Sequence, residues 1–128
     1  MKKPYWLTRD ECLALHDVML SQYGGIAGVR DENLLASALA RPQQLFAYGK
    51  PGMSELAAAY TAGIVKNHPF LDGNKRTGFM LGAGFLERNG HAFHATEAEA
   101  VLRTLALAAG EMSEADYAAW MKANSKRA

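Results

Sequence analysis

Helix-capping signals recur along the whole chain and divide it into about six short helical runs. Residues 8–11 and 96–99 each place a threonine three positions before a glutamate, which is the spacing of a capping box. Asp31, Ser54 and Ser113 stand where further helices could begin. The predicted helices cover 8–23, 32–40, 55–67, 74–88 and 96–109, with a last helix after residue 113. Little of the chain is left for strands, so the pattern predicts an all-α fold.

The connections carry turn signals. Pro42 is expected to end the second helix, because the residue before a proline disfavours the helical conformation. Leu45, Phe46 and Tyr48 stand beside a run of turn residues and predict a short β-element. Phe93 predicts a second short extended piece.

Composition limits the class of protein. The chain has 128 residues, of which 49% are hydrophobic, and this suits a single domain, 1–128, with a real core. The net charge of +1 gives no broad case for direct nucleic acid binding. The only basic cluster, 122–127, is interpreted as a solvated terminus. No apolar run is long enough for a signal peptide or a membrane span, so a cytoplasmic protein without membrane contact is expected.

The segment 68–78, HPFLDGNKRTG, concentrates chemical groups in one predicted turn between two helices. A glycine turn that opens a helix leaves backbone N–H groups free for an anion such as phosphate. Lys75 and Arg76 add positive charge, Asp72 can hold a divalent cation, and His68 can move a proton near neutral pH. The local chemistry predicts phosphate handling next to a general base.

Each of these residues alone has a structural explanation, since His68 or Asp72 could cap a helix and the two cations could simply be solvated. Their presence together favours a functional site. Phe70 is interpreted as the apolar plug that anchors the turn to the core. His16 is expected to be a core or interface histidine and Cys12 a buried thiol. Gly78, Gly82 and Gly84 are poor helix formers, and close helix packing is expected to explain all three.

The motif strongly resembles that of the Fic/Doc family. The Fic pattern is H-x-F-x-D/E-G-N-G-R-x-x-R, and the death-on-curing (Doc) branch has H-x-F-x-N/D-A/G-N-K-R. The residues that fill every place of the Doc pattern are His68, Phe70, Asp72, Gly73, Asn74, Lys75 and Arg76. Two positions depart from the Fic pattern: Lys75 replaces a glycine, and Phe79 stands at its last arginine. Residues 15–17, 23–25, 30–31 and 37–43 also look like the start of death-on-curing proteins, so the resemblance covers nearly the whole chain.

The resemblance implies a compact helical Fic/Doc domain that acts as the toxin of a toxin–antitoxin pair. It would be an ATP-dependent protein kinase that phosphorylates a threonine of elongation factor Tu and arrests translation. His68 would be the general base and Asp72 the Mg²⁺ ligand. Gly73 would permit the turn and Asn74 would bind a phosphate. Lys75 and Arg76 would neutralise charge on the transferring group. Residues 45–52 would form a short β-like flap that aligns the target by backbone pairing.

Two alternatives remain open from the sequence. Most Fic enzymes transfer AMP to a protein hydroxyl, and a silent helical module could keep the motif without activity.

The sequence lacks the inhibitory pattern S/T-x-x-x-E-G/N that some Fic proteins carry, because no serine or threonine has a glutamate four residues later. Control is therefore expected in trans, by a Phd-like antitoxin that folds into an apolar groove near residues 13–20.

Overall fold

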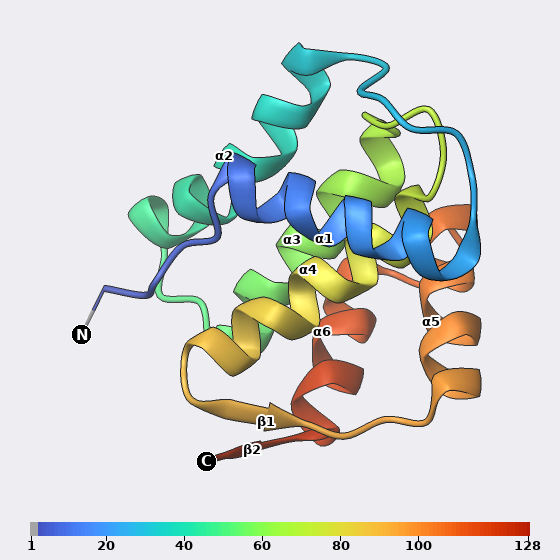
Figure 1. Ribbon diagram of the computed structural model, residues 1–128. Coiled ribbons are helices and arrows are strands. Elements are labelled where there is room, and N and C mark those ends of the chain that lie inside the picture. The colour runs from blue at the N-terminus through green and yellow to red at the C-terminus, as the bar shows by residue number, and fades with distance from the viewer. Residues whose placement is uncertain (1–2) are drawn as a thin grey trace.

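The computed structural model describes residues 3–128, which form six helices and one small sheet. Figure 1 shows the helices gathered around a central α3. The elements in chain order are α1 (Arg9–Tyr23), α2 (Glu32–Tyr48), α3 (Met53–Asn67), α4 (Asn74–Arg88), β1 (His91–Phe93), α5 (Glu97–Ala109), α6 (Glu114–Ala123) and β2 (Ser125–Arg127). The predicted all-α class is confirmed.

Helix α3 is the core of the molecule, since every residue from 56 to 65 is buried. An alanine-rich helix allows neighbours to approach closely on several sides, and α2, α4 and α6 all pack on it. The predicted close helix packing is confirmed at Gly78 and Gly82 of α4 but is wrong at Gly84, where the nearest atom to an added Cβ would be a Leu7 side-chain carbon at 4.0 Å. A Cβ on Gly82 would overlap the Thr61 hydroxyl and lie 2.9 Å from the Ala57 carbonyl oxygen, and one on Gly78 would lie 2.9 Å from Val65. These glycines let α4 lie directly against α3.

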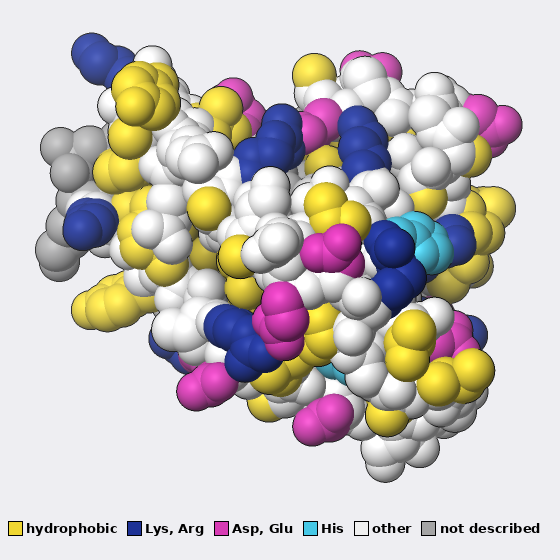
Figure 2. Space-filling model, turned by 90° about the horizontal axis from the view of Figure 1, so that it is seen from above, with side chains coloured by type: hydrophobic (Ala, Val, Ile, Leu, Met, Phe, Trp, Pro, Cys, Tyr) yellow, Lys and Arg dark blue, Asp and Glu magenta, His cyan; other side chains and the backbone are white. Residues whose placement is uncertain are grey.

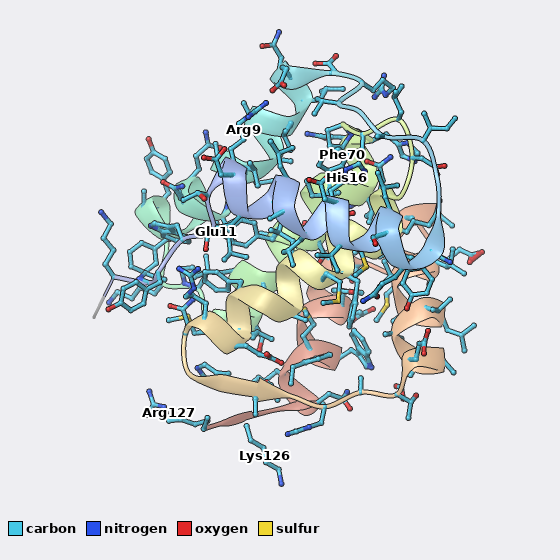
Figure 3. All side chains as sticks on the ribbon, in the orientation of Figure 1. Arg9, Glu11, His16, Phe70, Lys126 and Arg127 are labelled. Carbon is cyan, nitrogen blue, oxygen red and sulfur yellow. The ribbon has the colours of Figure 1, made fainter. Side chains whose placement is uncertain are left out.

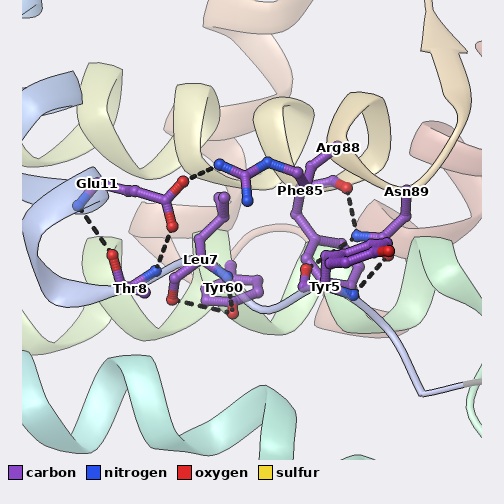
Figure 4. A network of polar contacts seen from close by, with 8 residues as sticks. All are labelled: Tyr5, Leu7, Thr8, Glu11, Tyr60, Phe85, Arg88 and Asn89. Carbon is purple, nitrogen blue, oxygen red and sulfur yellow. Dashed lines mark hydrogen bonds and ion pairs between the residues drawn. The ribbon is translucent and has the colours of Figure 1, made fainter.

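The start of α1 is tied to the end of α4 (Figure 4). The capping box at Thr8 and Glu11 is present, and Glu11 also forms an ion pair with Arg88. One residue before Thr8, the Leu7 N–H donates to the Tyr60 hydroxyl over 3.0 Å. Asn89, just after α4, exchanges two hydrogen bonds with the backbone of residue 5. α1 is thereby fixed across α4, and its C-terminal end reaches the motif.

The second helix is longer than the sequence predicts. Pro42 lies inside α2, which continues to Tyr48, so the predicted helix end and the β-like element at 45–48 are both wrong. Leu35, Ala38, Leu39 and Pro42 are buried on one face at helical spacing. Burial of that stripe against α3 outweighs the single backbone hydrogen bond that a proline removes. Only residues 49–52 remain as a loop.

The strands lie at the opposite end of the molecule from the motif. β1 pairs antiparallel with β2, with Ala92 opposite Lys126. The predicted extended piece at Phe93 is confirmed, and the basic side chains of the tail are exposed as expected, although residues 125–127 are also ordered as a strand. The Lys126 and Arg127 side chains are exposed and point away from the body (Figure 3). A three-residue edge strand has too little pattern to be recognised in sequence.

Candidate functional site

The motif forms the turn between α3 and α4. α3 ends at Asn67, and the residue that follows it, His68, has a left-handed backbone with φ of 53°. No other non-glycine residue between 3 and 128 has a positive φ. Gly73 supplies the second left-handed position, with φ of 76°, directly before α4. The chain therefore reverses at His68 and again enters a helix at Asn74. Left-handed geometry at a histidine is unfavourable, so surrounding contacts must hold it.

Asn74 is buried and organises the turn. Its side-chain oxygen accepts from the Phe70 N–H and its amide nitrogen donates to the Phe70 carbonyl, both over 3.0 Å. These two bonds fix which way the amide faces, so its remaining N–H points to Nδ1 of His68, 3.1 Å away. The amide thus orients the imidazole. Phosphate binding by Asn74 stays a prediction, and in this structure the amide faces the turn itself.

The predicted apolar plug is confirmed. Phe70 is fully buried, and its ring stacks on that of His16 with centroids 3.9 Å apart and an interplanar angle of 10° (Figure 3). His16 is buried too, and its Nε2 lies 2.9 Å from the Asp72 carbonyl oxygen. The expectation of a core histidine is therefore confirmed. His16 supports the turn from α1 and does not face solvent.

The Asp72 carboxylate is exposed and is held from two sides. Oδ1 accepts from the Gly73 N–H over 2.9 Å, and Oδ2 accepts from the Ile26 N–H over 3.2 Å. Among residues 3–128 no group of three His, Cys, Asp or Glu side chains could hold a metal ion. A single accessible carboxylate suits Mg²⁺, which is often held by one or two carboxylates together with substrate phosphates and water. The donor set fits the predicted ion in that way.

Lys75 and Arg76 occupy the exposed first turn of α4. Lys75 and His68 line one open depression of about 720 Å³, together with Lys66 and, on the far wall, Leu102 and Leu105 of α5. Asp72 and Arg76 are not among its lining residues. Figure 2 looks down on this end of the molecule and shows a histidine beside Lys and Arg side chains. The depression therefore joins a titratable ring, cations and an apolar wall.

Sequence reasoning missed the part played by the loop between α1 and α2. Residues 24–31 run beside the motif turn: Val29 forms an isolated antiparallel bridge with Phe70, and the Leu71 N–H donates to the Gly28 carbonyl over 3.1 Å. Tyr23, at the end of α1, lies under Arg76. The loop 24–31 is rich in glycine and overlaps the segments that resemble the start of death-on-curing proteins. Nothing local in the sequence predicts that it lies beside residues 68–72.

Other candidates have structural roles. Burial raises the pKa of the Cys12 thiol to about 12, so the expected inert, buried cysteine is confirmed. Phe79, at the position of the Fic arginine, is half-buried and packs edge-on against Phe93, with ring centroids 5.9 Å apart. It belongs to an aromatic cluster with Trp120 of α6. No helix within 3–128 has the length and apolarity that a membrane crossing needs.

The sequence of this chain is similar to those of known proteins. The sequence pattern of the Fic/DOC family matches residues 6–86. The chain is 33% identical over 114 residues to "Protein kinase doc" of Escherichia phage P1, covering 88% of this chain and 89% of that protein. It is 38% identical over 88 residues to "Toxin Doc" of Mycolicibacterium smegmatis, covering 66% and 65% of the two chains.

Proposed function

Because this chain belongs to the Fic/Doc family, we propose that it is a toxin that transfers the terminal phosphate of ATP to a protein hydroxyl. The observation that carries the proposal is the shared depression of His68 and Lys75, where a histidine and a cation lie within reach of one bound molecule. A relative matched over most of its length is named a protein kinase. Elongation factor Tu is the proposed target, and a threonine hydroxyl the proposed acceptor.

The residues divide the work of phosphoryl transfer. The hydroxyl oxygen forms a new bond to the γ-phosphorus, the bond from that phosphorus to the β–γ bridging oxygen breaks, and ADP leaves. The hydroxyl proton goes to His68. Lys75 and Arg76 neutralise charge on the phosphates, which is the main task of catalysis in this reaction. Asp72 would hold Mg²⁺, which supplies further neutralisation of phosphate charge.

The contact with Asn74 adds a condition to the proton transfer. The amide donates to Nδ1 of His68, so the neutral ring carries its proton on Nε2 in this arrangement. Accepting a proton at Nε2 requires the other tautomer, with the proton on Nδ1, in which the Asn74 amide no longer donates to the ring.

AMP transfer is the alternative reaction within the same family. Lys75 stands where the Fic pattern has a glycine, and Phe79 stands where it has an arginine. The Phe79 ring packs in an aromatic cluster with Phe93 and Trp120. A side chain packed in that cluster supplies no positive charge for a phosphate. Both substitutions favour a kinase over an AMP transferase. A silent module is less well supported, because His68 is exposed and lines the depression.

Control by an antitoxin in trans is part of the proposal, since a second relative is named a toxin. The groove expected near residues 13–20 stays a prediction: His16 and Met19 are buried there, and Val18 is 45% exposed. Two exposed apolar residues of α5 line the depression: Leu102 is 67% exposed and Leu105 is 44% exposed. We place the antitoxin contact there, where a bound helix would cover His68.

A labelling experiment tests the reaction. Purified chain is incubated with Mg-ATP, labelled at either the γ- or the α-phosphate, and elongation factor Tu. A kinase transfers only the γ-label and releases ADP, whereas an AMP transferase transfers the α-label and releases pyrophosphate. A His68→Asn variant controls for contaminating kinases. Absence of both labels from the target, under conditions in which the chain is folded, would contradict the proposal that this target is modified.

A further inference from the structure

Arg30, in the loop between α1 and α2, holds the last carbonyl groups of α3. Its Nε donates to the His68 carbonyl oxygen over 2.7 Å, and its terminal nitrogen donates to the Asn67 carbonyl over 3.0 Å. The last carbonyls of a helix lack partners within the helix, and a positive charge there also complements the helix dipole. Arg30 thus caps α3 from a segment 37 residues earlier in the chain.

The backbone N–H groups of Arg30 and its neighbour bind the next carbonyl of the turn. The Arg30 N–H donates to the Pro69 carbonyl over 2.6 Å, and the Asp31 N–H donates to the same oxygen over 3.1 Å. Three successive carbonyls, those of residues 67, 68 and 69, are therefore bound by Arg30 and its neighbour. The middle one belongs to the single left-handed non-glycine residue of the described chain. A flat, two-pronged guanidinium suits two neighbouring carbonyls better than an ammonium group does.

We propose that Arg30 is a positioning residue for His68. Its guanidinium stabilises the left-handed turn at His68 and so sets the direction of the imidazole, while Asn74 holds the ring from the other side. The inference rests on the proposed function in that it assigns Arg30 a role in transfer. Arg30 contacts only main-chain oxygens of the motif and is not itself placed at the phosphates.

The simpler interpretation is that Arg30 only caps α3 and adds stability. The two interpretations differ in what the Arg30→Ala variant loses. The backbone bonds of residues 30 and 31 to Pro69, and the bond from Leu71 to Gly28, do not depend on the Arg30 side chain. The turn should therefore persist without the guanidinium, and the conformation of His68 alone should relax. A stabilising cap would change the melting temperature without changing the chemistry of the folded enzyme.

The experiment compares Arg30→Ala, Arg30→Gln and a matched control, Arg9→Ala. Arg9 is exposed and pairs with Glu32 across the α1–α2 junction, so its loss removes a similar cation without touching the motif. For Arg30→Ala we expect kcat of γ-phosphate transfer to fall roughly 10- to 100-fold, as for a misplaced catalytic group. KM for ATP should be unchanged, Arg30→Gln should be intermediate, and millimolar guanidinium should partly restore Arg30→Ala. Arg9→Ala should behave as wild type.

A second readout does not require activity. NMR signals of the His68 ring, identified by their loss in His68→Asn, should move in Arg30→Ala and stay in place in Arg9→Ala. Unchanged His68 signals together with an unchanged kcat would overturn the inference while leaving the proposed kinase intact. If the wild-type chain transfers no phosphate, the proposed function fails, and the NMR comparison still decides whether Arg30 positions His68. If Arg30→Ala does not fold, Arg30→Gln carries the same comparison.

Discussion

The guanidinium of Arg76 lies over the ring of Tyr23, with its central carbon 4.2 Å from the ring centroid. Tyr23 closes α1 and Arg76 opens α4, so the contact joins the ends of two helices beside the motif turn. Stacking on an aromatic face restricts where an exposed arginine can go. In the proposed kinase, this contact keeps one phosphate-binding cation close to the site before ATP arrives.

Replacing Tyr23 by leucine should weaken ATP binding. An exposed cation–π contact is worth about 0.5–1 kcal/mol, so we expect the Kd for Mg-ATP to rise roughly two- to fivefold, as measured by calorimetry. Tyr23→Phe keeps the ring and should bind as wild type. Tyr48→Leu removes a tyrosine that is 92% exposed and serves as the control. Equal affinity of the Tyr23→Leu and Tyr23→Phe variants would argue against a role for the stacked ring.

Replacing His68 should separate chemistry from stability. Asparagine tolerates the left-handed backbone better than alanine does, so His68→Asn should melt closer to wild type than His68→Ala. Both should lower transfer about 10²- to 10⁴-fold, the usual contribution of a general base. Thermal melts and transfer assays on the same samples measure both effects. Full transfer by a folded His68→Asn protein would remove His68 from the mechanism.

Two glycines of α4 should respond oppositely to alanine. At Gly82 the added Cβ has no room against Thr61 and Ala57, so the free energy of unfolding should fall by about 1–3 kcal/mol. At Gly84 the nearest atom is a Leu7 methyl carbon at 4.0 Å. Gly84→Ala should therefore be neutral or stabilising by up to about 1 kcal/mol, because alanine favours the helix. Urea unfolding measures both, and an equally stable Gly82→Ala would contradict the close α3–α4 packing.

Stability should decline at alkaline pH. Burial raises the pKa of Cys12, Tyr60 and Tyr117 to about 12, from ordinary values of 9.0 for the thiol and 10.0 for the phenols. Between the ordinary and the raised values, the unfolded chain binds fewer protons than the folded one. The free energy of unfolding therefore falls as pH rises from about 9 toward 12.

Urea unfolding from pH 8 to 11 measures this slope, with Tyr117→Phe as the comparison. The variant loses the hydrogen bond between Tyr117 and Thr104, at a cost of about 1 kcal/mol, so the slopes are compared and not the absolute values. Its stability should fall less steeply with pH than that of wild type. Identical slopes would show that Tyr117 does not contribute through its ionisation.

The capped helices were predictable because their signals are local. Thr8, Thr96 and Ser113 each cap the helix that the sequence predicts at that point. The length of α2 was not predictable. Pro42 is a strong local helix breaker, and its effect is overcome only because the helix is buried on α3. The pairing of 125–127 with β1 was missed for the same kind of reason, since its partner lies more than thirty residues away.

The sequence by itself determined the helical class and the set of chemical groups in the motif, because both depend on residues close together in the chain. It also determined that Phe70 anchors the turn and that Cys12 is inert. Only the tertiary structure decided how the motif is held: by Arg30 at the carbonyl groups, by Ile26 at the Asp72 carboxylate, and by Tyr23 beneath Arg76. These contacts join segments about 40 to 50 residues apart, and no local propensity encodes such a distance. They form when α1 packs on α4 and carries the following loop to the motif.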